Sequence, residues 1–392
     1  MYIATKDSPL ATTITGSLPR PAWYTESLHG RAFREAMTDN NFREQYSDAV
    51  SCLIRDQERA GLDIVTDGDA RFDVDVGGRS WVSYTLERLQ GVTGFEKRRS
   101  EAARKNTTQP GDILFEVLEA WALPEVTGKL GPGPLELPQL WRTAQQMTRK
   151  PVKVGVASPE TLALLLPNRF YDDREELLAD LSGIMREELL RVAESGSAVL
   201  QVEEPWVHRA DFTQKEAAAQ AEASVRWFNK GVQGLRERTE LWCHTCWGNP
   251  AQQRTFDINK RYEPALEYMN ELDADVVTFE CATTRGVDIA SIGRKITKPK
   301  VAIGVIDHHT LQVERPEEVA ALIRMALECI PPERLVISTD CGFGREGMSR
   351  RHAFYKMVAL VRGTNIVRKE LGLPEAHIPA TENRYALSDE DE

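Results

Sequence analysis

Short apolar runs alternate with longer amphipathic stretches through most of this chain. The runs are rich in β-branched and aromatic residues and are bounded by polar or turn-forming residues, which is typical of strands. The stretches between them, such as 173–194, 213–236 and 316–329, repeat apolar residues at helical spacing. Eight β/α units of this kind predict an α/β fold, the TIM (β/α)8 barrel, as a single domain. The eight predicted strands are 13–17, 62–67, 152–156, 198–203, 240–244, 275–280, 300–305 and 335–340.

Two regions fall outside this alternation. Residues from about 70 to 150 separate the second and third predicted strands by far more than one crossover needs, and they contain the Gly-Pro-Gly-Pro run 131–134. We expect an insertion there, an elaborated loop or lid on a barrel that spans residues 1–385. The last residues, 386–392, are acidic and lack apolar periodicity, which predicts a solvated, frayed tail.

Length and charge narrow the classes of function. The 392 residues can form one large barrel or two ordinary domains, so length does not choose between them. A formal net charge of −11 argues against nucleic acid and anionic membranes as partners, because both bind excess Lys and Arg, and it favours a small-molecule substrate. No run of about 18 apolar residues is present, and the first residues lack the basic-then-apolar pattern of a secretion signal. We therefore expect a cytoplasmic protein.

Reactive side chains gather where the predicted strands end. The carboxyl ends of the strands form the active-site face of a TIM barrel, because the βα loops meet there. The six cysteines are too sparse for a disulfide scaffold, and in a reducing compartment they would be free for metal binding or catalysis. The reactive residues at or just beyond strand ends are Ser17, Asp67, Asp69, Glu203, Glu204, His244, Cys246, Glu280, Asp307, His309, Asp340 and Cys341.

Four of these residues can close a tetrahedron around zinc, which favours thiolate sulfur and imidazole nitrogen. His244 and Cys246 are two residues apart, so both side chains point to one side, and glycines after Cys341 let its thiolate face the barrel mouth. Glu280 is preferred to Cys281 because the alternation of an extended strand turns only one of the two inward. The sequence therefore predicts a zinc site of these two cysteines, the histidine and the glutamate.

Seven short segments between residues 14 and 342 carry a resemblance to a known family. They are Ile14-Thr15-Gly16-Ser17-Leu18-Pro19, Thr66-Asp67-Gly68-Asp69, Gln201-Val202-Glu203-Glu204-Pro205, His244-Thr245-Cys246, Phe279-Glu280, Ile306-Asp307-His308-His309 and Asp340-Cys341-Gly342. On these segments the chain resembles the catalytic domain of cobalamin-independent methionine synthase, within the wider family of zinc-dependent alkyl-thiol transferases. In length it is similar to the short, single-barrel members.

The resemblance implies a TIM barrel that holds zinc through the same four ligands. It also implies that Ser17 receives the carboxylate of an amino-acid substrate and that Asp69 and Glu203 hold its ammonium. Two departures leave the substrates open. Asp69 stands where methionine synthases usually carry glutamate, and the second, amino-terminal barrel that contributes to folate binding in full-length members is lacking.

The predicted ligands point to thiol alkylation. Zinc deprotonates a thiol near neutral pH and leaves its sulfur nucleophilic. Glu280, a harder ligand than sulfur, is the one to loosen when the substrate arrives. His309 can protonate the leaving group, with Asp307 orienting it. His308 is expected to point the opposite way in an extended segment and to be structural.

The sequence therefore predicts zinc-dependent transfer of a methyl group to a small thiol, above all homocysteine, giving methionine. Candidate donors are 5-methyltetrahydrofolate and a methylated corrinoid protein. One alternative is the addition of coenzyme M to an epoxyalkane, which would require arginine or lysine for the sulfonate where this chain has two carboxylates. A zinc hydrolase is another alternative, although hydrolytic zinc usually prefers histidine and carboxylate ligands. A non-catalytic binding protein is the last, and it would not need His309.

Overall fold

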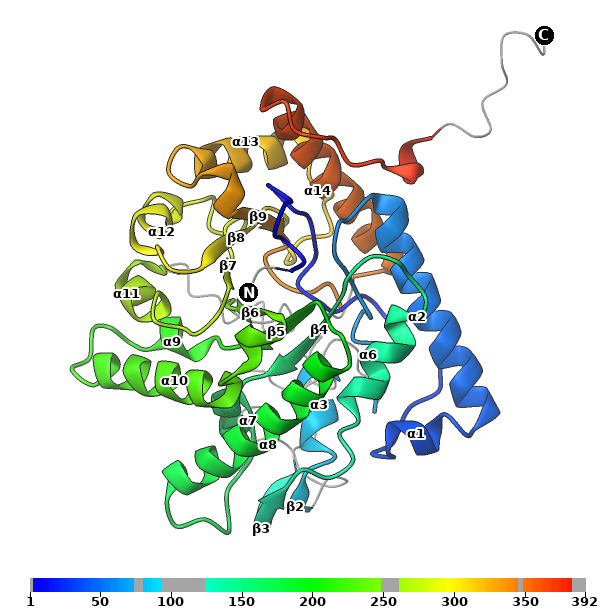
Figure 1. Ribbon diagram of the computed structural model, residues 1–392, viewed down its shortest axis with the longest axis vertical. Coiled ribbons are helices and arrows are strands. Elements are labelled where there is room, and N and C mark those ends of the chain that lie inside the picture. The colour runs from blue at the N-terminus through cyan, green and yellow to red at the C-terminus, as the bar shows by residue number, and fades with distance from the viewer. Residues whose placement is uncertain (1–2, 74–79, 94–123, 248–260, 345–347, 383–392) are drawn as a thin grey trace, which may run out of the picture.

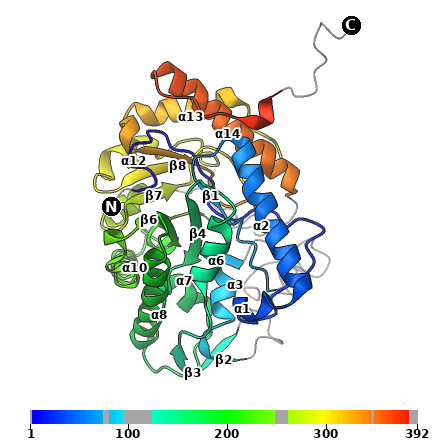
Figure 2. The ribbon, with the colours of Figure 1, turned by 45° about the vertical axis from the view of Figure 1, so that its right-hand side comes forward.

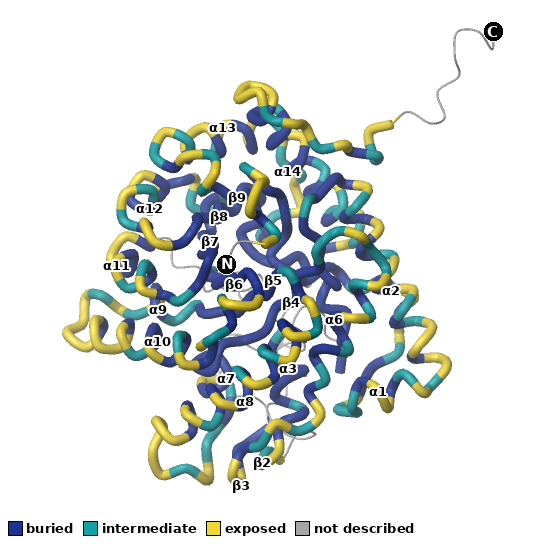
Figure 3. The backbone as a smooth tube through the Cα atoms, viewed as in Figure 1, coloured by how far each residue is buried: buried dark blue, intermediate teal, exposed yellow. Residues whose placement is uncertain are grey.

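A computed structural model describes residues 3–73, 80–93, 124–247, 261–344 and 348–382 of the chain. Strands occupy the centre of the molecule and helices surround them (Figure 1). The strands at the centre are buried, whereas the exposed residues gather on the outer turns of the helices (Figure 3). None of the described helices is long and apolar enough to cross a membrane.

One parallel sheet carries seven strands in the order β1-β4-β5-β6-β7-β8-β9. Seven of the eight predicted strands are therefore present, most of them within a residue or two of the expected bounds. β1 is shorter than predicted, because residues before Val65 bond to the amino-terminal segment instead. The strands are β1 (Val65–Thr66), β4 (Val152–Ala157), β5 (Val199–Glu203), β6 (Glu240–His244), β7 (Val276–Phe279), β8 (Lys300–Gly304) and β9 (Leu335–Ser338).

The first predicted strand, 13–17, forms no regular strand, but its neighbourhood closes the barrel. Thr12 makes a parallel bridge to Ile337 of β9, and its carbonyl accepts the N–H of Ile64 just before β1 at 3.1 Å. A side chain replaces one of the backbone hydrogen bonds of a regular strand, since the Asp63 carboxylate accepts the N–H of Thr12 at 2.8 Å. The segment thus lies between β9 and β1 and takes the place of the eighth strand of the barrel. The TIM barrel prediction is therefore confirmed.

The helices follow the strands around the outside and begin at capping side chains. Asp39 accepts the N–H groups of the first turn of α2, Asp173 caps α8 and Ser349 caps α14. The helices are α1 (Phe33–Ala36), α2 (Asn40–Ala60), α3 (Ser80–Leu86), α6 (Leu137–Gln145), α7 (Pro159–Leu165), α8 (Arg174–Glu194), α9 (Trp206–Arg209), α10 (Ala217–Val232), α11 (Leu266–Met269), α12 (Ile289–Lys295), α13 (Pro316–Leu327) and α14 (Arg350–Glu370), with 3-10 turns η1 (Leu235–Glu237), η3 (Glu263–Ala265), η4 (Pro332–Arg334) and η5 (Pro379–Thr381).

Two separate apolar clusters make the core. The larger lies between the sheet and the helices. The smaller consists of inward-facing residues from neighbouring strands and the first segment of the barrel, and Trp242 is its largest member. It therefore fills the barrel interior. The interior is therefore packed toward the amino ends of the strands, which leaves the carboxyl ends to build a site. The smaller cluster is Ala11, Ile64, Val199, Trp242, Val276, Ala302 and Val336.

The predicted insertion contains regular structure. After α3, strand β2 (Gln90–Thr93) pairs with β3 (Glu125–Gly131) in an antiparallel ribbon, and α6 leads back to β4. The ribbon lies at the opposite end of the molecule from α13 and α14 (Figure 2). Residues 94–123 of the insertion and the predicted acidic tail lie outside the described residues.

Candidate active site

Three of the four predicted zinc ligands come together at the carboxyl end of the barrel. His244 is the last residue of β6, Cys246 follows two residues later, and Cys341 lies in the loop after β9. Their ligand atoms are all within 4.8 Å of one another, and the two sulfurs are 3.6 Å apart. Two sulfurs bound to one tetrahedral zinc at about 2.3 Å would be about 3.8 Å apart. The spacing of the sulfurs therefore fits one zinc ion.

The imidazole of His244 is fixed by Thr278 of β7. Nδ1 of the ring lies 2.7 Å from the Thr278 hydroxyl, whereas the buried Nε2 has no hydrogen-bond partner among the described residues. A buried imidazole nitrogen without a partner is costly unless something binds it. A metal ligand is commonly held in this way, with its other ring nitrogen bonded to a neighbouring group.

The thiols also fit a cation. The hydrogen bond with Cys341 and burial raise the pKa of the Cys246 thiol well above its ordinary value, and the negative charge of Glu280 adds to the effect. Without a cation the pair would stay protonated, because two thiolates in contact repel each other. The residues present therefore suit a soft divalent ion that is bound by thiolates.

Glu280, the fourth predicted ligand, follows β7 and faces a second group. Its carboxylate lies within 4.8 Å of ring nitrogens of both His308 and His309. Oε2 accepts the N–H of Trp247 at 2.7 Å and Oε1 accepts the hydroxyl of Thr283 at 2.6 Å. Glu280 thus lies beside the three clustered donors, with its oxygens turned toward partners outside that cluster.

His308 was expected to point away from His309, and this expectation was wrong. The centroids of the two rings are 3.8 Å apart. β8 ends at Gly304 and the chain turns at 308–309, so the alternation of an extended strand does not apply there. Asp307 lies beside His309, with Nδ1 3.3 Å from Oδ1. Although burial raises the pKa of the Asp307 carboxyl, the hydrogen bonds and charge of His309 hold it below its ordinary value.

Asp340 ties two of the ligand loops together. Its Oδ1 accepts the N–H groups of Cys281 and Ala282, and its Oδ2 accepts that of Thr283, at 2.7–2.9 Å. Gly304 of β8 makes room, because a Cβ there would overlap Asp340 Oδ1. The loop that carries Glu280 is therefore anchored on the residue that precedes Cys341.

Aromatic residues pack against the loops that carry Cys246 and Glu280 and form hydrogen bonds with their backbone. The Tyr262 hydroxyl accepts the N–H of Glu280 at 3.1 Å and lies 3.3 Å from the carbonyl of Thr245. His208 packs on Tyr262 and Trp247, and its Nε2 lies 3.0 Å from the Cys246 carbonyl. Tyr262 and His208 were not predicted from the sequence, because Tyr262 lies far from any strand end and His208 lies on the short helix α9 beyond the end of β5. Thr278 had a signal, since it lies two residues before Glu280 on the same face of β7.

Ser17 and Asp69, two predicted substrate residues, lie in neighbouring loops. Ser17 is buried against the loop after β9, where its hydroxyl accepts the N–H of Gly344 at 3.3 Å and a Cβ at Gly342 would overlap it. Asp69 has a left-handed φ of 52°. A Cβ on Gly16 would lie 3.2 Å from Asp69 Oδ2, so the carboxylate lies directly beside the segment that carries Ser17.

A buried arginine accompanies Asp69. Arg71 lies 3.1 Å from Asp67 Oδ2 and 3.3 Å from Asp69 Oδ1, and it donates to the carbonyl of Gly155 on β4. All three charged side chains are buried. Burying a charged group is costly unless it is paired and hydrogen-bonded, so Arg71 offsets the cost of burying Asp67 and Asp69 in the barrel mouth.

Glu203, the third predicted substrate residue, ends β5 directly beside His244, its register partner on β6. Gly155 separates Glu203 from the Arg71 network, since a Cβ there would lie 3.4 Å from Glu203 Oε1. The structure thus places Glu203 between the clustered metal donors and the loop that carries Asp69.

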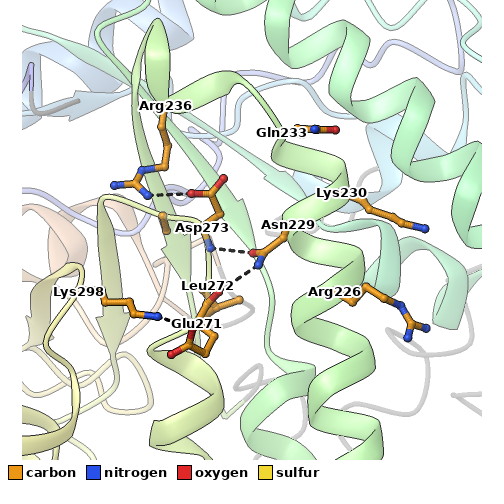
Figure 4. Close-up of a pocket in the computed structure, with 10 residues that line it drawn as sticks. Arg226, Asn229, Lys230, Gln233, Arg236, Glu271, Leu272, Asp273 and Lys298 are labelled. Atoms are coloured by element: carbon orange, nitrogen blue, oxygen red, sulfur yellow. Dashed lines mark hydrogen bonds and ion pairs between the residues drawn. The ribbon is translucent and has the colours of Figure 1, made fainter.

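The surface hollow drawn in Figure 4 is remote from these residues. It is lined by the end of α10 and by the segments that lead into β6, β7 and β8, which lie at the amino ends of the strands. Four of its charged groups pair within the hollow, Arg236 with Asp273 at 2.8 Å and Lys298 with Glu271. It contains none of the predicted site residues.

Comparisons with known proteins agree along nearly the whole chain. A family model described as "Cobalamin-independent synthase, Catalytic domain" matches residues 10–362. Curated relatives include methionine synthases of Saccharolobus solfataricus, 28% identical over 363 residues (92% of this chain, 96% of the relative), and of Thermococcus kodakarensis, 29% identical over 363 residues (92% and 94%).

Solved structures match as well. A B12-independent methionine synthase from Shewanella sp. W3-18-1, in complex with selenomethionine, superimposes with a TM-score of 0.75 at 26% identity, covering 93% of this chain and 99% of that one. A methyltransferase from Methanosarcina mazei has a TM-score of 0.53 at 15% identity, covering 95% and 97%, which is a likeness of fold alone.

Proposed function

The chain belongs to the family of the cobalamin-independent synthase catalytic domain, and from this we propose that it transfers a methyl group to the sulfur of homocysteine, giving methionine. Zinc dependence is supported by the convergence of His244, Cys246 and Cys341, with the buried Nε2 of His244 lacking a hydrogen-bond partner among the described residues. The cobalamin-independent description of the family argues against a methylated corrinoid protein, one of the donors that the sequence left open. A methylated folate is therefore the donor we propose.

Four residues would hold the zinc ion: His244, Cys246, Cys341 and Glu280. A zinc ion bound there would keep a substrate thiol deprotonated near neutral pH while leaving its sulfur nucleophilic. Glu280 is suited to give up its place to the substrate, because its oxygens have the Trp247 N–H and other partners. A carboxylate with such partners can leave a ligand set without losing all its hydrogen bonds.

The amino-acid part of the substrate binds on the other side of the donors. Asp69 and Glu203 are buried carboxylates at the barrel mouth, and together they suit one ammonium group. Ser17 lies at the junction of the first loop and the loop after β9, where it and the adjoining backbone can receive the substrate carboxylate. Homocysteine presents its ammonium, carboxylate and thiol in an arrangement that these three places can accept together.

His309 supplies the proton for the leaving group of the methyl donor. Asp307 faces Nδ1 of His309, so Nε2 is the nitrogen that gives the proton. The depressed pKa of Asp307 keeps its carboxylate ionised at neutral pH, which stabilises the protonated imidazole. The donor's product thus leaves as a neutral amine and not as an anion.

The test is to form methionine with the zinc-loaded protein, homocysteine and 5-methyltetrahydrofolate, and to follow the product by mass spectrometry and the zinc by elemental analysis. We expect about one zinc per chain. Cys246→Ser should lose both zinc and product, whereas Cys329→Ser, which alters a half-buried cysteine on the helical layer, should keep both. Full zinc retention in Cys246→Ser, or methionine formed equally well after zinc removal, would refute the proposal.

A further inference from the structure

Lys153, the second residue of β4, places an ammonium group inside the barrel. Its side chain is 1% exposed, and Nζ lies 2.7 Å from Gln201 Oε1 and 4.4 Å from the centroid of the Trp242 ring. Within the described part of the chain it forms no ion pair with an acid. A buried ammonium without such a pair is costly, so its position calls for a reason.

Gln201 connects Lys153 to the predicted ammonium site. An ammonium only donates hydrogen bonds, so Gln201 must turn its oxygen toward Lys153 and its NH2 group the other way. That NH2 group lies 3.0 Å from the Thr15 carbonyl and 3.5 Å from Glu203 Oε1. Gly155, two residues after Lys153 on the same face of β4, lies beside both the Gln201 amide group and the Glu203 carboxylate. Lys153 therefore sets the direction in which Gln201 donates to Glu203.

Three acids act on Lys153 from the surrounding elements. Burial lowers the pKa of Lys153 to about 7, although Glu203 of β5, Asp69 of the loop after β1 and Glu240 of β6 raise it. Asp69 already has Arg71 beside it at 3.3 Å. Among the cations of the described residues, Lys153 acts on the Glu203 side of the mouth, whereas Arg71 acts on the Asp69 side.

On the described elements packed against β4, the other charged or titratable groups have partners of their own. Tyr84 of α3 donates its hydroxyl proton to a backbone carbonyl, and Arg142 of α6 binds a surface hydroxyl. Asp67 is held by Arg71 at 3.1 Å. A change of charge at Lys153 would therefore be felt first through Gln201 and Glu203.

We propose that Lys153 is a positioning residue that balances the carboxylates of the amino-acid subsite and gives up a proton when the substrate ammonium arrives. The inference rests on the proposed function, since it requires an ammonium between Asp69 and Glu203. A second cation there opposes the charge of Lys153. The Lys153 ammonium then releases one proton to the buffer and becomes a neutral amine, which still donates an N–H to Gln201. One positive charge enters the site and one leaves.

Titration calorimetry with L-methionine on the zinc-loaded protein tests this exchange. Methionine carries the same ammonium and carboxylate as homocysteine but no thiol proton, so any proton released comes from the protein. Measured in buffers of different ionisation enthalpy at pH 7, binding should release up to about half a proton, because a group with a pKa near 7 is about half protonated there. By linkage, affinity should rise between pH 6 and 8, by less than about tenfold per unit.

Two variants separate this role from a merely structural one. Lys153→Met should bind methionine without releasing that proton, and its affinity should be nearly independent of pH. Lys300→Met, which removes a buried lysine bonded to Thr5 at the amino end of β8, should keep the proton release and the pH profile of the wild type. Equal proton release and equal pH profiles in Lys153→Met and the wild type would overturn the inference.

A measurement on the wild type covers the case in which Lys153→Met fails to fold. In protein labelled at lysine Cε, one carbon signal should titrate near neutral pH, and its midpoint should fall when methionine binds. Titration of every lysine above about pH 9 would overturn the inference. Failure of methionine to bind at all would refute the proposed function, and the inference with it. Binding without a proton linked to Lys153 would refute the inference alone.

Discussion

Replacing Asp340 by asparagine tests how the candidate metal site is held. The Asp340 carboxylate accepts three backbone N–H groups of the loop after β7, those of Cys281, Ala282 and Thr283. Asparagine keeps only one acceptor oxygen. If that oxygen serves Cys281 and Ala282, the new NH2 group faces the N–H of Thr283, donor against donor.

The cost follows from these contacts. Asp340 is 1% exposed, so a lost hydrogen bond is not replaced by water. A hydrogen bond to a charged group contributes about 1.5–3 kcal/mol, and a neutral oxygen weakens the other two bonds as well. We expect Asp340→Asn to lower the free energy of unfolding by about 2–4 kcal/mol.

The charge state of Asp340 decides the outcome. Burial and the charge of Glu280 raise the pKa of the Asp340 carboxyl. Protonation, however, would place an O–H against one of the three N–H groups, since both oxygens already accept. We therefore expect the carboxylate to be ionised at neutral pH and Asp340→Asn to lower the free energy of unfolding by the full amount given above.

Urea unfolding at neutral pH, followed by circular dichroism, measures the effect. A chelator removes metal from both proteins, so a change cannot arise from zinc binding. Asp211→Asn is the matched control, because its exposed carboxylate also accepts a backbone N–H, that of Thr213, and its midpoint should not move. A loss below about 0.5 kcal/mol in Asp340→Asn would show that the carboxyl is neutral and would refute the reasoning.

Three further substitutions probe the site itself. Cys341→Ser should lose most of the zinc in elemental analysis while circular dichroism stays that of the wild type, since barrel cores do not depend on a residue at the mouth; a folded variant with full zinc contradicts the ligand assignment. Glu203→Gln should weaken methionine binding by about 1.5–3 kcal/mol, roughly 10- to 150-fold by calorimetry, and unchanged affinity would place the ammonium elsewhere. His309→Asn should lower turnover by about 10²- to 10⁴-fold with zinc content and methionine affinity kept; a small loss of turnover would make His309 structural.

Much of the barrel could be predicted because its strands are buried on both faces. β6 has the predicted bounds, and β4 differs from its prediction by one residue. The first segment of the barrel could not be predicted as irregular, because its pairing depends on remote side chains. Asp63 accepts the N–H of Thr12, and the Thr339 hydroxyl accepts that of Thr15. The local pattern of apolar and polar residues gives no sign of such remote acceptors.

The candidate site also has features that the sequence could predict and features that it could not. The proximity of His244 and Cys341 could be predicted from their positions at strand ends, because parallel strands of a barrel all end on one face. The orientation of His308 depends on how the chain turns after β8, which spacing alone does not fix. Lys153 lies within a predicted strand, yet a lone lysine in a strand is ordinarily taken to face solvent. Only the closed barrel shows that this face of β4 points inward.

The charges at the barrel mouth bear on which thiol the protein takes. Arg71 is already bound to Asp67, Asp69 and a backbone carbonyl, and Lys153 lies below Gln201 and so is screened from the mouth by it. A sulfonate-bearing thiol such as coenzyme M would therefore add a negative charge beside two carboxylates without gaining a cation. An ammonium instead forms favourable hydrogen bonds with both carboxylates. Because Lys153 can release a proton in return, the subsite accepts that cation without building up charge in a buried space, which favours an amino thiol over a sulfonate.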